Sequence, residues 1–361
     1  MVLTVRFAKN GITNSVLNSV SHLDPARVRC DLVAPNEPDA EAKLAFTRTG
    51  GQVFVLDGRN RNPVAYVRKL ANIVRLREIE VLHAHGNSAT LYTEMFAGIH
   101  GGAKVRLAHS HNTTCRMKLA DRLLRGAFYQ GYTGAVACSE AAGEWLFPNR
   151  PFLVLNNAVE TERFRYSETL RAATRAALGL TENSLVLLHV GAFNAQKNQA
   201  FLIGAFAELR KTAPKAALLL VGDGANRAAC EAQAKRLGMV DFVRFLGWRE
   251  DMLALLAAAD AFALPSLHEG LPLTIVEAQC AGLPCLVSDR VTREAALTGL
   301  VSFCPISSEK AFAGALLQIE RQNRAKASEA AIAQVKRAGF DADENAGRLM
   351  QCYESWTGRL V

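Results

Sequence analysis

The stretch ALPSLHEGLPLTIVEAQCAGLPCLVSD, residues 263–289, carries the pattern that decides the fold of this chain. It starts in an apolar strand that ends at Pro265, continues through a loop, forms an apolar helix from about Pro272, and returns to an apolar strand at 284–288. Strands that are apolar on both faces are typical of a parallel sheet covered by helices. The stretch therefore predicts a strand–helix–strand unit of an α/β fold.

Short apolar strands and helical segments alternate along the rest of the chain. The strands expected before residue 160 are Val2–Ala8, Cys30–Ala34, Gln52–Leu56, Val81–His85, Lys104–Ser110, Ala135–Ser139 and Phe152–Leu155. Those expected after the charged, strand-free stretch 160–184 are Leu185–Gly191, Ala216–Val221, Phe242–Leu246, Ala261–Pro265, Pro284–Ser288 and Val301–Cys304. From Glu309 onward the pattern is almost entirely helical.

The restart of this alternation predicts two doubly wound, Rossmann-like domains that face an interdomain cleft. We expect one domain over 1–165, a second over 166–340, and a C-terminal helix over 341–361 that could cross back to the first domain. In open α/β sheets ligands bind beyond the carboxyl ends of the strands. The loops that follow strands are therefore where functional residues are expected.

The composition excludes several classes of protein. The chain has 361 residues, half of them apolar, and no run reaches the ~18 apolar residues of a membrane span. The N-terminus lacks the charged start and long apolar core of a signal peptide. The eight cysteines are scattered without a C-x-x-C pair, so neither a disulfide framework nor a zinc site is expected. We expect a reduced, cytoplasmic protein.

The net charge of +8 lies almost entirely in the first half, because residues 1–165 carry 21 basic and 14 acidic side chains. Four of the cations, beside several leucines, are Arg116, Lys118, Arg122 and Arg125. This basic, amphipathic segment is either a solvated surface helix or a surface for anionic lipid or a lipid-diphosphate acceptor. A peripheral position on the inner face of the cell membrane would follow from the second reading. No motif or aromatic array indicates nucleic acid.

Two loops of the second domain carry groups suited to an anionic ligand. Lys197 precedes a helix N-terminus, where it could help hold an anion, or it is a solvated loop lysine. Gly222 and Gly224 form a turn that lets the backbone approach a ligand closely. The turn does not match the dinucleotide fingerprint, since Arg227 stands where a third glycine is required.

The 263–289 stretch contains two glutamates eight residues apart, Glu269 before the helix and Glu277 within it. Free amides near Gly270, Leu271 and Thr274 could bind a phosphate or sugar oxygen. Glu277 could accept two hydroxyls of a ribose. The alternative is a Glu269 that caps the helix and a Glu277 that faces solvent.

The segment HEGLPLTIVEAQCAGLP, residues 268–284, resembles the E-x7-E motif of family 4 retaining glycosyltransferases of the GT-B fold. Six accompanying segments look similar to that family: HVGAFNAQKN (189–198), LLLVGDG (218–224), FLGWREDM (245–252), AGEWLFPNRPFLVLNNAVETERF (142–164), AHSHNTT (108–114) and NGITNSVLNSV (10–20). The resemblance runs from about residue 5 to 320. It is nearest to bacterial enzymes that build exopolysaccharide or capsular polysaccharide.

The resemblance implies a nucleotide-sugar donor, most commonly a UDP-sugar, in the second domain. Glu277 would bind its ribose, and Glu269 would lie against the donor sugar near its reacting face. Lys197 would neutralise the leaving diphosphate. The remaining groups implied for the donor are the backbone of Gly270, Leu271 and Pro272, the glycines Gly11, Gly191 and Gly222, and Arg249 beside the base.

The first domain would bind the acceptor, a saccharide or a lipid-diphosphate-linked saccharide. His111 matches a histidine of the acceptor-domain wall near the hydroxymethyl group of the donor sugar, and His109 on the same strand competes for that role. The chain departs from the family at Ala192, where an arginine is common, and at Asn10, where the glycine loop has a second glycine. Lys197 would then act alone on the phosphate, or another arginine would reach in.

The resemblance supplies no nucleophile for a double displacement, so front-face transfer with retention is expected, with the leaving phosphate helping to deprotonate the acceptor. No D-x-D pair is present, and neither a metal nor a cofactor is expected. The alternatives are a non-catalytic partner subunit of the same fold and a sugar-nucleotide epimerase. A phosphorylase would need a pyridoxal-phosphate lysine that the sequence does not identify.

Overall fold

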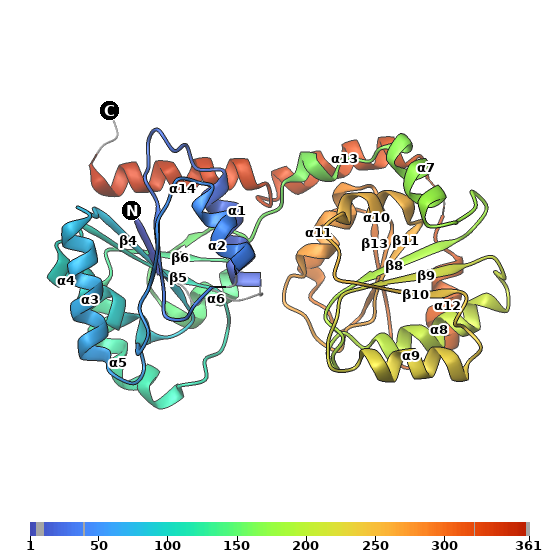
Figure 1. The fold of residues 1–361 in the computed structure, drawn as a ribbon, viewed down its shortest axis with the longest axis horizontal. Coiled ribbons are helices and arrows are strands. Elements are labelled where there is room, and N and C mark those ends of the chain that lie inside the picture. The colour runs from blue at the N-terminus through green and yellow to red at the C-terminus, as the bar shows by residue number, and fades with distance from the viewer. Residues whose placement is uncertain (5–10, 39, 321, 359–361) are drawn as a thin grey trace. The chain divides into compact units, whose positions relative to one another are not determined.

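The structure, a computed structural model, describes residues 1–4, 11–38, 40–320 and 322–358 (Figure 1). The chain divides into two compact units. The N-terminal unit comprises the described residues of Met1–Ala158 and Asp341–Val361, and the C-terminal unit comprises those of Val159–Phe340. The division after Ala158 lies seven residues before the boundary that the sequence indicated.

The N-terminal unit is built on one parallel sheet with strand order β3-β2-β1-β4-β5-β6-β7. Its strands are β1 (Val2–Thr4), β2 (Asp31–Ala34), β3 (Val53–Val55), β4 (Val81–Gly86), β5 (Val105–Ser110), β6 (Gly134–Ala137) and β7 (Leu153–Val154). Its helices are α1 (Gly11–Ser21), α2 (Ala40–Thr47), α3 (Pro63–Leu76), η1 (Ala89–Leu91), α4 (Tyr92–Gly101), α5 (Lys118–Gly131), α6 (Glu140–Leu146) and α14 (Ala342–Thr357).

The C-terminal unit repeats the arrangement with the parallel order β10-β9-β8-β11-β12-β13. Its strands are β8 (Val186–Val190), β9 (Ala217–Val221), β10 (Val243–Gly247), β11 (Ala261–Leu264), β12 (Cys285–Ser288) and β13 (Val301–Cys304). Its helices are η2 (Thr161–Phe164), α7 (Glu168–Ala177), α8 (Gln199–Arg210), α9 (Arg227–Arg236), α10 (Met252–Ala258), α11 (Leu273–Cys280), η3 (Arg293–Ala295), α12 (Glu309–Leu317) and α13 (Arg324–Arg337).

The predicted α/β class and its strands are confirmed, with shifts of a few residues at their ends. The part of the first expected strand beyond Thr4 lies outside the described residues. The strands β9 and β11 are buried along their whole length, as their unbroken apolar runs require. The strands β2 and β12 are also fully buried, although each contains one polar residue, Asp31 and Ser288. The described residues after Glu309 contain helices and no strand.

The C-terminal helix α14 belongs to the N-terminal unit, along which it lies in Figure 1. It begins at an N-cap, Asp341, whose carboxylate accepts a hydrogen bond from the amide of Glu344. Its buried face packs Leu349, Met350 and Tyr353 into the core under β1 and β4. A segment far from the first strands in sequence therefore completes their hydrophobic core. Within the described residues, no helix is long and apolar enough to cross a membrane.

Candidate functional site

The strand order of the C-terminal sheet reverses between β8 and β11. At such a switch point the connections leave toward opposite faces of the sheet, so the carboxyl ends of the two strands open a crevice for a ligand. The loop after β8 carries Lys197, and the loop after β11 carries Glu269. The fold therefore brings together two residues that are 72 positions apart in the sequence.

Lys197 and Glu269 form an ion pair, with Nζ 2.7 Å from Oε1 and little exposure of either side chain. Two further contacts fasten the loops together: the amide of Leu267 donates to the carbonyl of Gln196 at 2.8 Å, and Gln196 Nε2 donates to the carbonyl of His268 at 3.0 Å. The ammonium group is therefore held in place before any ligand arrives, which is the arrangement that stabilises a developing anion.

Glycines allow the neighbouring loops to approach closely. The aliphatic part of Lys197 packs over Gly191, where an added Cβ would lie 3.0 Å from it. Gly222 has φ +127°, and a Cβ there would lie 2.2 Å from the carbonyl oxygen of Gly191. Only glycine fits this position, because the backbone of the loop after β9 touches the loop after β8. Gly191 and Gly222 thus shape the surface beside Lys197.

Four buried polar atoms of the same two connections have no hydrogen-bond partner in the described part of the chain. They are His189 Nε2, Gln199 Oε1, Ser266 Oγ and Thr274 Oγ1. Burial lowers the pKa of His189 to about 4, with the Lys197 ammonium as a further cause, so its imidazole is neutral. Buried polar atoms without partners are costly and are typical of a ligand site. The sequence pattern indicated only the amide of Thr274 among these groups, because the signal of the others is no more than their position beside the motifs.

Glu277 lies on α11, which packs against η2. Its half-buried carboxyl group forms no hydrogen bond or ion pair with the described residues. Burial raises its pKa to about 7, and Arg163 opposes this rise. A carboxyl group that has no protein partner and a pKa near 7 is available to bind a polar ligand. The alternative of a freely solvated Glu277 is not what the structure shows.

The helix α11 begins one residue later than the sequence indicated, with Pro272 as its N-cap and no side chain capping it. Glu269 is not the cap, because its carboxylate pairs with Lys197 and its backbone forms a parallel bridge with Val291. Gly270 is exposed, and a Cβ added there would meet nothing within 4 Å. The backbone at Gly270 is therefore accessible, and it continues through Leu271 and Pro272 into the first turn of α11.

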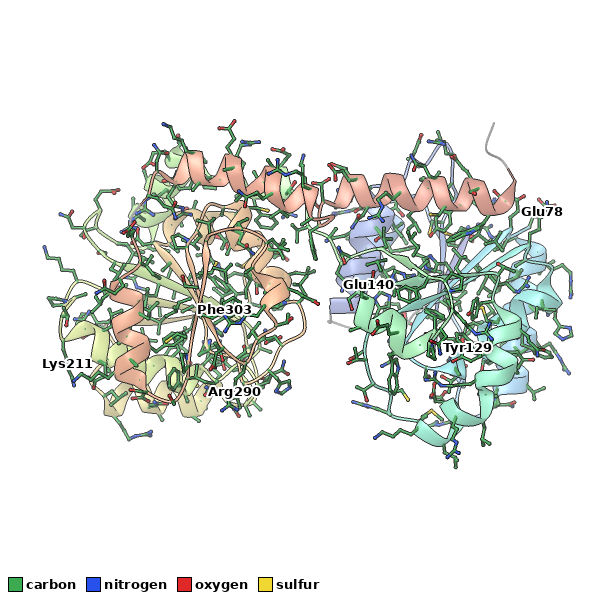
Figure 2. All side chains as sticks on the ribbon, turned by 180° about the vertical axis from the view of Figure 1, so that it is seen from behind. Glu78, Tyr129, Glu140, Lys211, Arg290 and Phe303 are labelled. Carbon is green, nitrogen blue, oxygen red and sulfur yellow. The ribbon has the colours of Figure 1, made fainter. Side chains whose placement is uncertain are left out.

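Two arginines lie near other strand ends of this sheet. Arg249 follows β10 and is held by Asp251 through contacts of 2.8 and 2.6 Å, so its guanidinium is already paired. Arg290 follows β12, immediately before the Val291 that bridges to Glu269, and Figure 2 labels it. It is exposed and has no ion pair with the described residues. Arg290 is thus a further cation for this edge, which the sequence analysis did not single out.

In the N-terminal unit, His111 lies one residue beyond the carboxyl end of β5. Its Nε2 lies 2.9 Å from Nδ1 of His85, its ring stacks on His109, and burial lowers its pKa to about 4. His109 lies within the strand, is 4% exposed and pairs with His83 at 3.2 Å. The structure thus places His111 at the ligand edge and His109 inside the sheet, without testing the role of either.

Asn10 of the expected glycine loop lies outside the described residues. Gly11 itself is the first residue of α1.

The four cations of the basic segment differ in exposure. Arg116, Lys118 and Arg122 are exposed, beside the exposed apolar side chains of Met117, Leu119 and Leu123. Arg125 does not lie on this exposed surface, although the sequence pattern grouped it with Arg116, Lys118 and Arg122. It is half-buried, pairs with Asp121 at 2.9 Å and donates to Tyr129 Oη, because its side chain turns toward the core side of α5.

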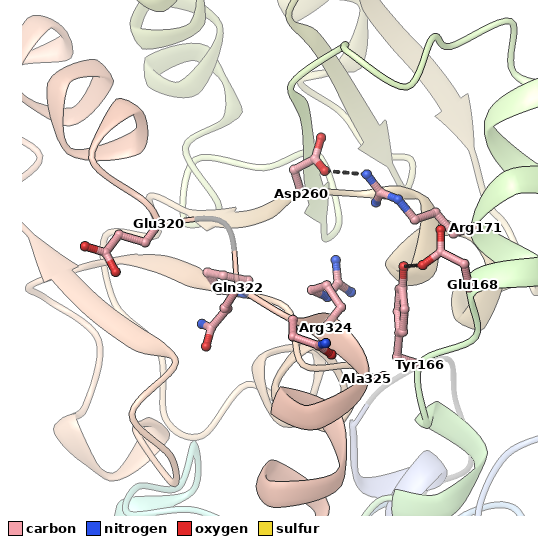
Figure 3. A pocket seen from close by; sticks show the side chains of 10 residues that line it. Tyr166, Glu168, Arg171, Asp260, Glu320, Gln322, Arg324 and Ala325 are labelled. Carbon is pink, nitrogen blue, oxygen red and sulfur yellow. Dashed lines mark hydrogen bonds and ion pairs between the residues drawn. The ribbon is translucent and has the colours of Figure 1, made fainter.

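A cavity of about 460 Å³ lies at the opposite, amino-terminal edge of the C-terminal sheet, beside Asp260 and Pro284 (Figure 3). Its arginines are used by the fold: Arg171 pairs with Asp260 at 2.6 Å, and Arg324 donates to the carbonyls of Ala259 and Ala281. These contacts satisfy carbonyls at the ends of α10 and α11. The cavity is therefore a product of helix packing and is not the candidate site.

Comparison with known proteins places both halves of the chain in one family. Residues 9–163 match the family described as Glycosyltransferase Family 4, and residues 171–337 match Glycosyl transferases group 1. The chain is 30% identical over 362 residues to EpsF of Bacillus subtilis (strain 168), which is assigned as a glycosyltransferase. That match covers 96% of this chain and 93% of EpsF.

Two further similarities are informative. Over 144 residues the chain is 38% identical to the UDP-Gal:alpha-D-GlcNAc-diphosphoundecaprenol alpha-1,3-galactosyltransferase of Escherichia coli, covering 38% of this chain and 36% of that protein. The fold is similar to that of HepE from Anabaena, solved in complex with UDP, with a TM-score of 0.80, 20% identity, and coverage of 98% and 99%. Together with the paired loops at the switch point, these matches establish that the chain belongs to the family 4 glycosyltransferases of the GT-B fold.

Proposed function

We propose that the chain transfers a sugar from a UDP-sugar to a saccharide or lipid-diphosphate-linked saccharide acceptor, with retention of the anomeric configuration. The observation that carries this proposal is the Lys197–Glu269 pair at the switch point of the C-terminal sheet. Cleavage of a sugar–diphosphate bond places negative charge on the leaving phosphate and positive charge on the anomeric carbon. A fixed ammonium beside a carboxylate presents one group of opposite sign to each.

In this proposal Lys197 stabilises the leaving diphosphate, and Arg290 supplies the guanidinium that the chain lacks at Ala192. Glu269 faces the positive side of the sugar. The leaving phosphate helps remove the proton of the attacking hydroxyl on the same face, so retention needs no protein nucleophile. These cations take the charge-stabilising role that a metal has in other transferases, and we propose a transfer step independent of divalent metal.

The donor nucleotide is proposed from two observations. The free carboxyl group of Glu277, with its pKa of about 7, can accept hydrogen bonds from two adjacent ribose hydroxyls when ionised. The structural neighbour HepE was solved with UDP, and the relative from Escherichia coli is named for a UDP-linked galactose donor. UDP is therefore the first nucleotide to test.

The acceptor is proposed to bind a cavity of about 620 Å³ in the N-terminal unit, at the carboxyl ends of β1 to β4. Polar groups line it, including Asp57, Asn60 and Asn87, and Arg61 adds an exposed cation without an ion pair in the described residues. Hydroxyl-rich ligands need such hydrogen-bonding partners, and a cation favours an acceptor that carries phosphate. The relative from Escherichia coli is named for a diphosphate-linked acceptor.

A panel of UDP-, GDP- and ADP-sugars tests the proposal. We expect one UDP-sugar to raise the melting temperature and to release UDP slowly in the absence of an acceptor, and the product of transfer to show retention by NMR. Activity should persist with EDTA. A folded chain that binds a UDP-sugar but neither hydrolyses nor transfers it would support a non-catalytic subunit, and a changed sugar without transfer would support an epimerase.

We further propose that α5 contacts the inner face of the membrane, where a lipid-linked acceptor would reside. The support is the exposed set of Met117, Leu119 and Leu123 beside Arg116 and two further cations. Vesicles containing anionic lipid should bind the chain, and Leu119→Glu with Leu123→Glu should reduce binding about tenfold or more. The same changes at exposed Leu76 and Val64 on α3 are the control. Equal binding of both variants would contradict the proposal.

A further inference from the structure

Four histidine side chains from neighbouring strands of the N-terminal sheet stack on one another. Strand β4 carries His83 and His85, and β5 carries His109, with His111 following it. Alternate residues of a strand point to the same face, and the parallel register pairs His85 with His109. The rings of His83 and His85 stack at 4.3 Å, and those of His109 and His111 stack at 4.2 Å.

Hydrogen bonds join the two strands through these rings. His83 Nε2 lies 3.2 Å from His109 Nδ1, and His85 Nδ1 lies 2.9 Å from His111 Nε2. Each pair can share only one proton, since one nitrogen donates and the other accepts. The other nitrogen of His83 is held by the hydroxyl of Tyr353 on α14 at 2.8 Å. His83 is therefore oriented from outside the stack.

The stack leaves polar atoms unused. His85 Nε2, His109 Nε2 and His111 Nδ1 are buried without a hydrogen-bond partner in the described residues. A cavity of about 10 Å³ is lined by His83, His85 and His109, by the polar side chains of Ser19 and Tyr353, and otherwise by apolar side chains. This volume is about that of a single water-sized sphere. Orphaned nitrogens around such a space indicate a small bound species.

We propose that His83, His85 and His109 form a binding site for a divalent transition metal, with Zn²⁺ as its representative. One nitrogen of each residue lies within 4.8 Å of the other two. Two nitrogens on a tetrahedral zinc lie about 3.4 Å apart, and His83 Nε2 and His109 Nδ1 lie 3.2 Å apart. Zn²⁺ would replace the proton that these two nitrogens share, and that proton would be released to solvent. For the third nitrogen to reach the same distance, the ring of His85 would turn out of its stack with His83.

The chemistry of the donors selects the class of metal. Imidazole suits Zn²⁺, Cu²⁺ and Ni²⁺, whereas Mg²⁺ and Ca²⁺ require oxygen ligands, and no carboxylate belongs to this cluster. Tyr353 fixes the ring of His83, as partners of metal-bound histidines commonly do.

The metal would join β4, β5 and α14 through His83, His109 and Tyr353. Its effect would be on the stability of the N-terminal unit, because a ligand that binds only the folded state raises the melting temperature. The inference does not rest on the proposed function, since Lys197 and Glu269 belong to the other unit.

The test titrates Zn²⁺ into the metal-stripped full chain against a chromogenic chelator. We expect one Zn²⁺ per chain with submicromolar affinity and a raised melting temperature. His109→Leu should weaken binding about 100-fold, whereas His100→Ala, an exposed histidine on α4, should leave it unchanged. If His109→Leu lacks the circular dichroism of the native chain, His85→Asn at the less buried end of the stack replaces it.

Cobalt distinguishes this site from the eight free cysteines. Co²⁺ in the unmodified chain should give the visible absorption of tetrahedral nitrogen coordination without a thiolate charge-transfer band. A thiolate band, a weak six-coordinate spectrum, less than stoichiometric Zn²⁺, or equal affinity of the histidine variants and the unmodified chain would each overturn the proposal.

Discussion

The two units share one strand order around their first and fourth strands, yet the residues on and after their central strands differ in chemistry. In the C-terminal unit, β8 and β11 are followed by loops that join Lys197 and Glu269 into an ion pair. In the N-terminal unit, β4 and β5 contain a stack of neutral imidazoles. The charged residues lie on loops beyond the sheet, whereas the histidines, except His111, lie within the strands.

This difference shows that the fold determines where a site can form, whereas the residues at that position determine its chemistry. Loops beyond the strand ends can change without disturbing the core, and they carry the groups expected to meet the donor. Groups inside the strands are desolvated by the core, so they must be neutral or paired. The predictions below test whether the charged edge of the C-terminal unit acts as a ligand site and whether its glycine loops pack as closely as the structure shows.

The largest effect is expected from Lys197→Ala. Removing the ammonium leaves the leaving diphosphate without its fixed counter-charge, so kcat for sugar transfer should fall about 10²- to 10³-fold. Lys211→Ala is the matched control, because Lys211 is an exposed lysine that pairs with Glu208. A loss of less than fivefold for Lys197→Ala, with donor binding retained, would remove Lys197 from the transfer step.

Gly222→Ala should destabilise the C-terminal unit by about 3 kcal/mol or more. The alanine would combine an unfavourable φ of +127° with a Cβ 2.2 Å from the carbonyl oxygen of Gly191. Gly314→Ala on α12 meets nothing within 4 Å and should be neutral or stabilising. Urea unfolding of both variants measures the difference, and equal midpoints would contradict the close approach of the two loops.

Glu277→Gln should weaken the binding of UDP-sugar about 10- to 100-fold, because an amide replaces a carboxylate that accepts two hydroxyls. The same change should raise stability at pH 8 by up to about 3 kcal/mol, since burial raises the pKa of Glu277 from 4.5 to about 7. Calorimetry and thermal melting measure the two effects. Exposed Glu329→Gln is the control, and unchanged donor affinity would refute the ribose role.

The affinity of the unmodified chain for UDP-sugar should depend on pH through Glu277. The folded-state pKa is raised to about 7, so about half of the binding carboxylate is ionised at pH 7. The carboxylate is almost fully present above about pH 8 and is lost as the pH falls through about 7. Affinity should decrease about tenfold per pH unit between pH 6 and pH 5. Calorimetry across this range should show a flat profile for Glu277→Gln, and a parallel slope in both proteins would assign the titration to another group.

The smallest effect is expected from Arg290→Gln, a loss of about three- to tenfold in donor affinity. Arg290 is exposed, so solvent screens its charge more than that of Lys197. Arg337→Gln on α13 controls for the loss of one surface cation. Added salt should reduce the difference in donor affinity between Arg290→Gln and the unmodified chain. If this difference does not change with salt, Arg290 has no direct electrostatic role in donor binding.

Local patterns in the sequence predicted most of the fold. The apolar runs, such as those of β9 and β11, specify buried strands wherever they fold, because burial on both faces demands apolar side chains. Spacing and residue type likewise predicted the two glutamates and Lys197 as candidates. The packing of Arg125 could not be predicted, because helical spacing does not reveal that its side chain binds Asp121 and Tyr129.

The sequence by itself determined the α/β class, the order of strands and helices, and the residues of the E-x7-E motif. Only the tertiary structure decided which of these residues meet. The Lys197–Glu269 pair, the orphaned atoms of Ser266 and Thr274, and the histidine stack depend on contacts between distant segments. The pKa of Glu277 depends on its burial. Desolvation and proximity are properties of the packed chain, so no local pattern can encode them alone.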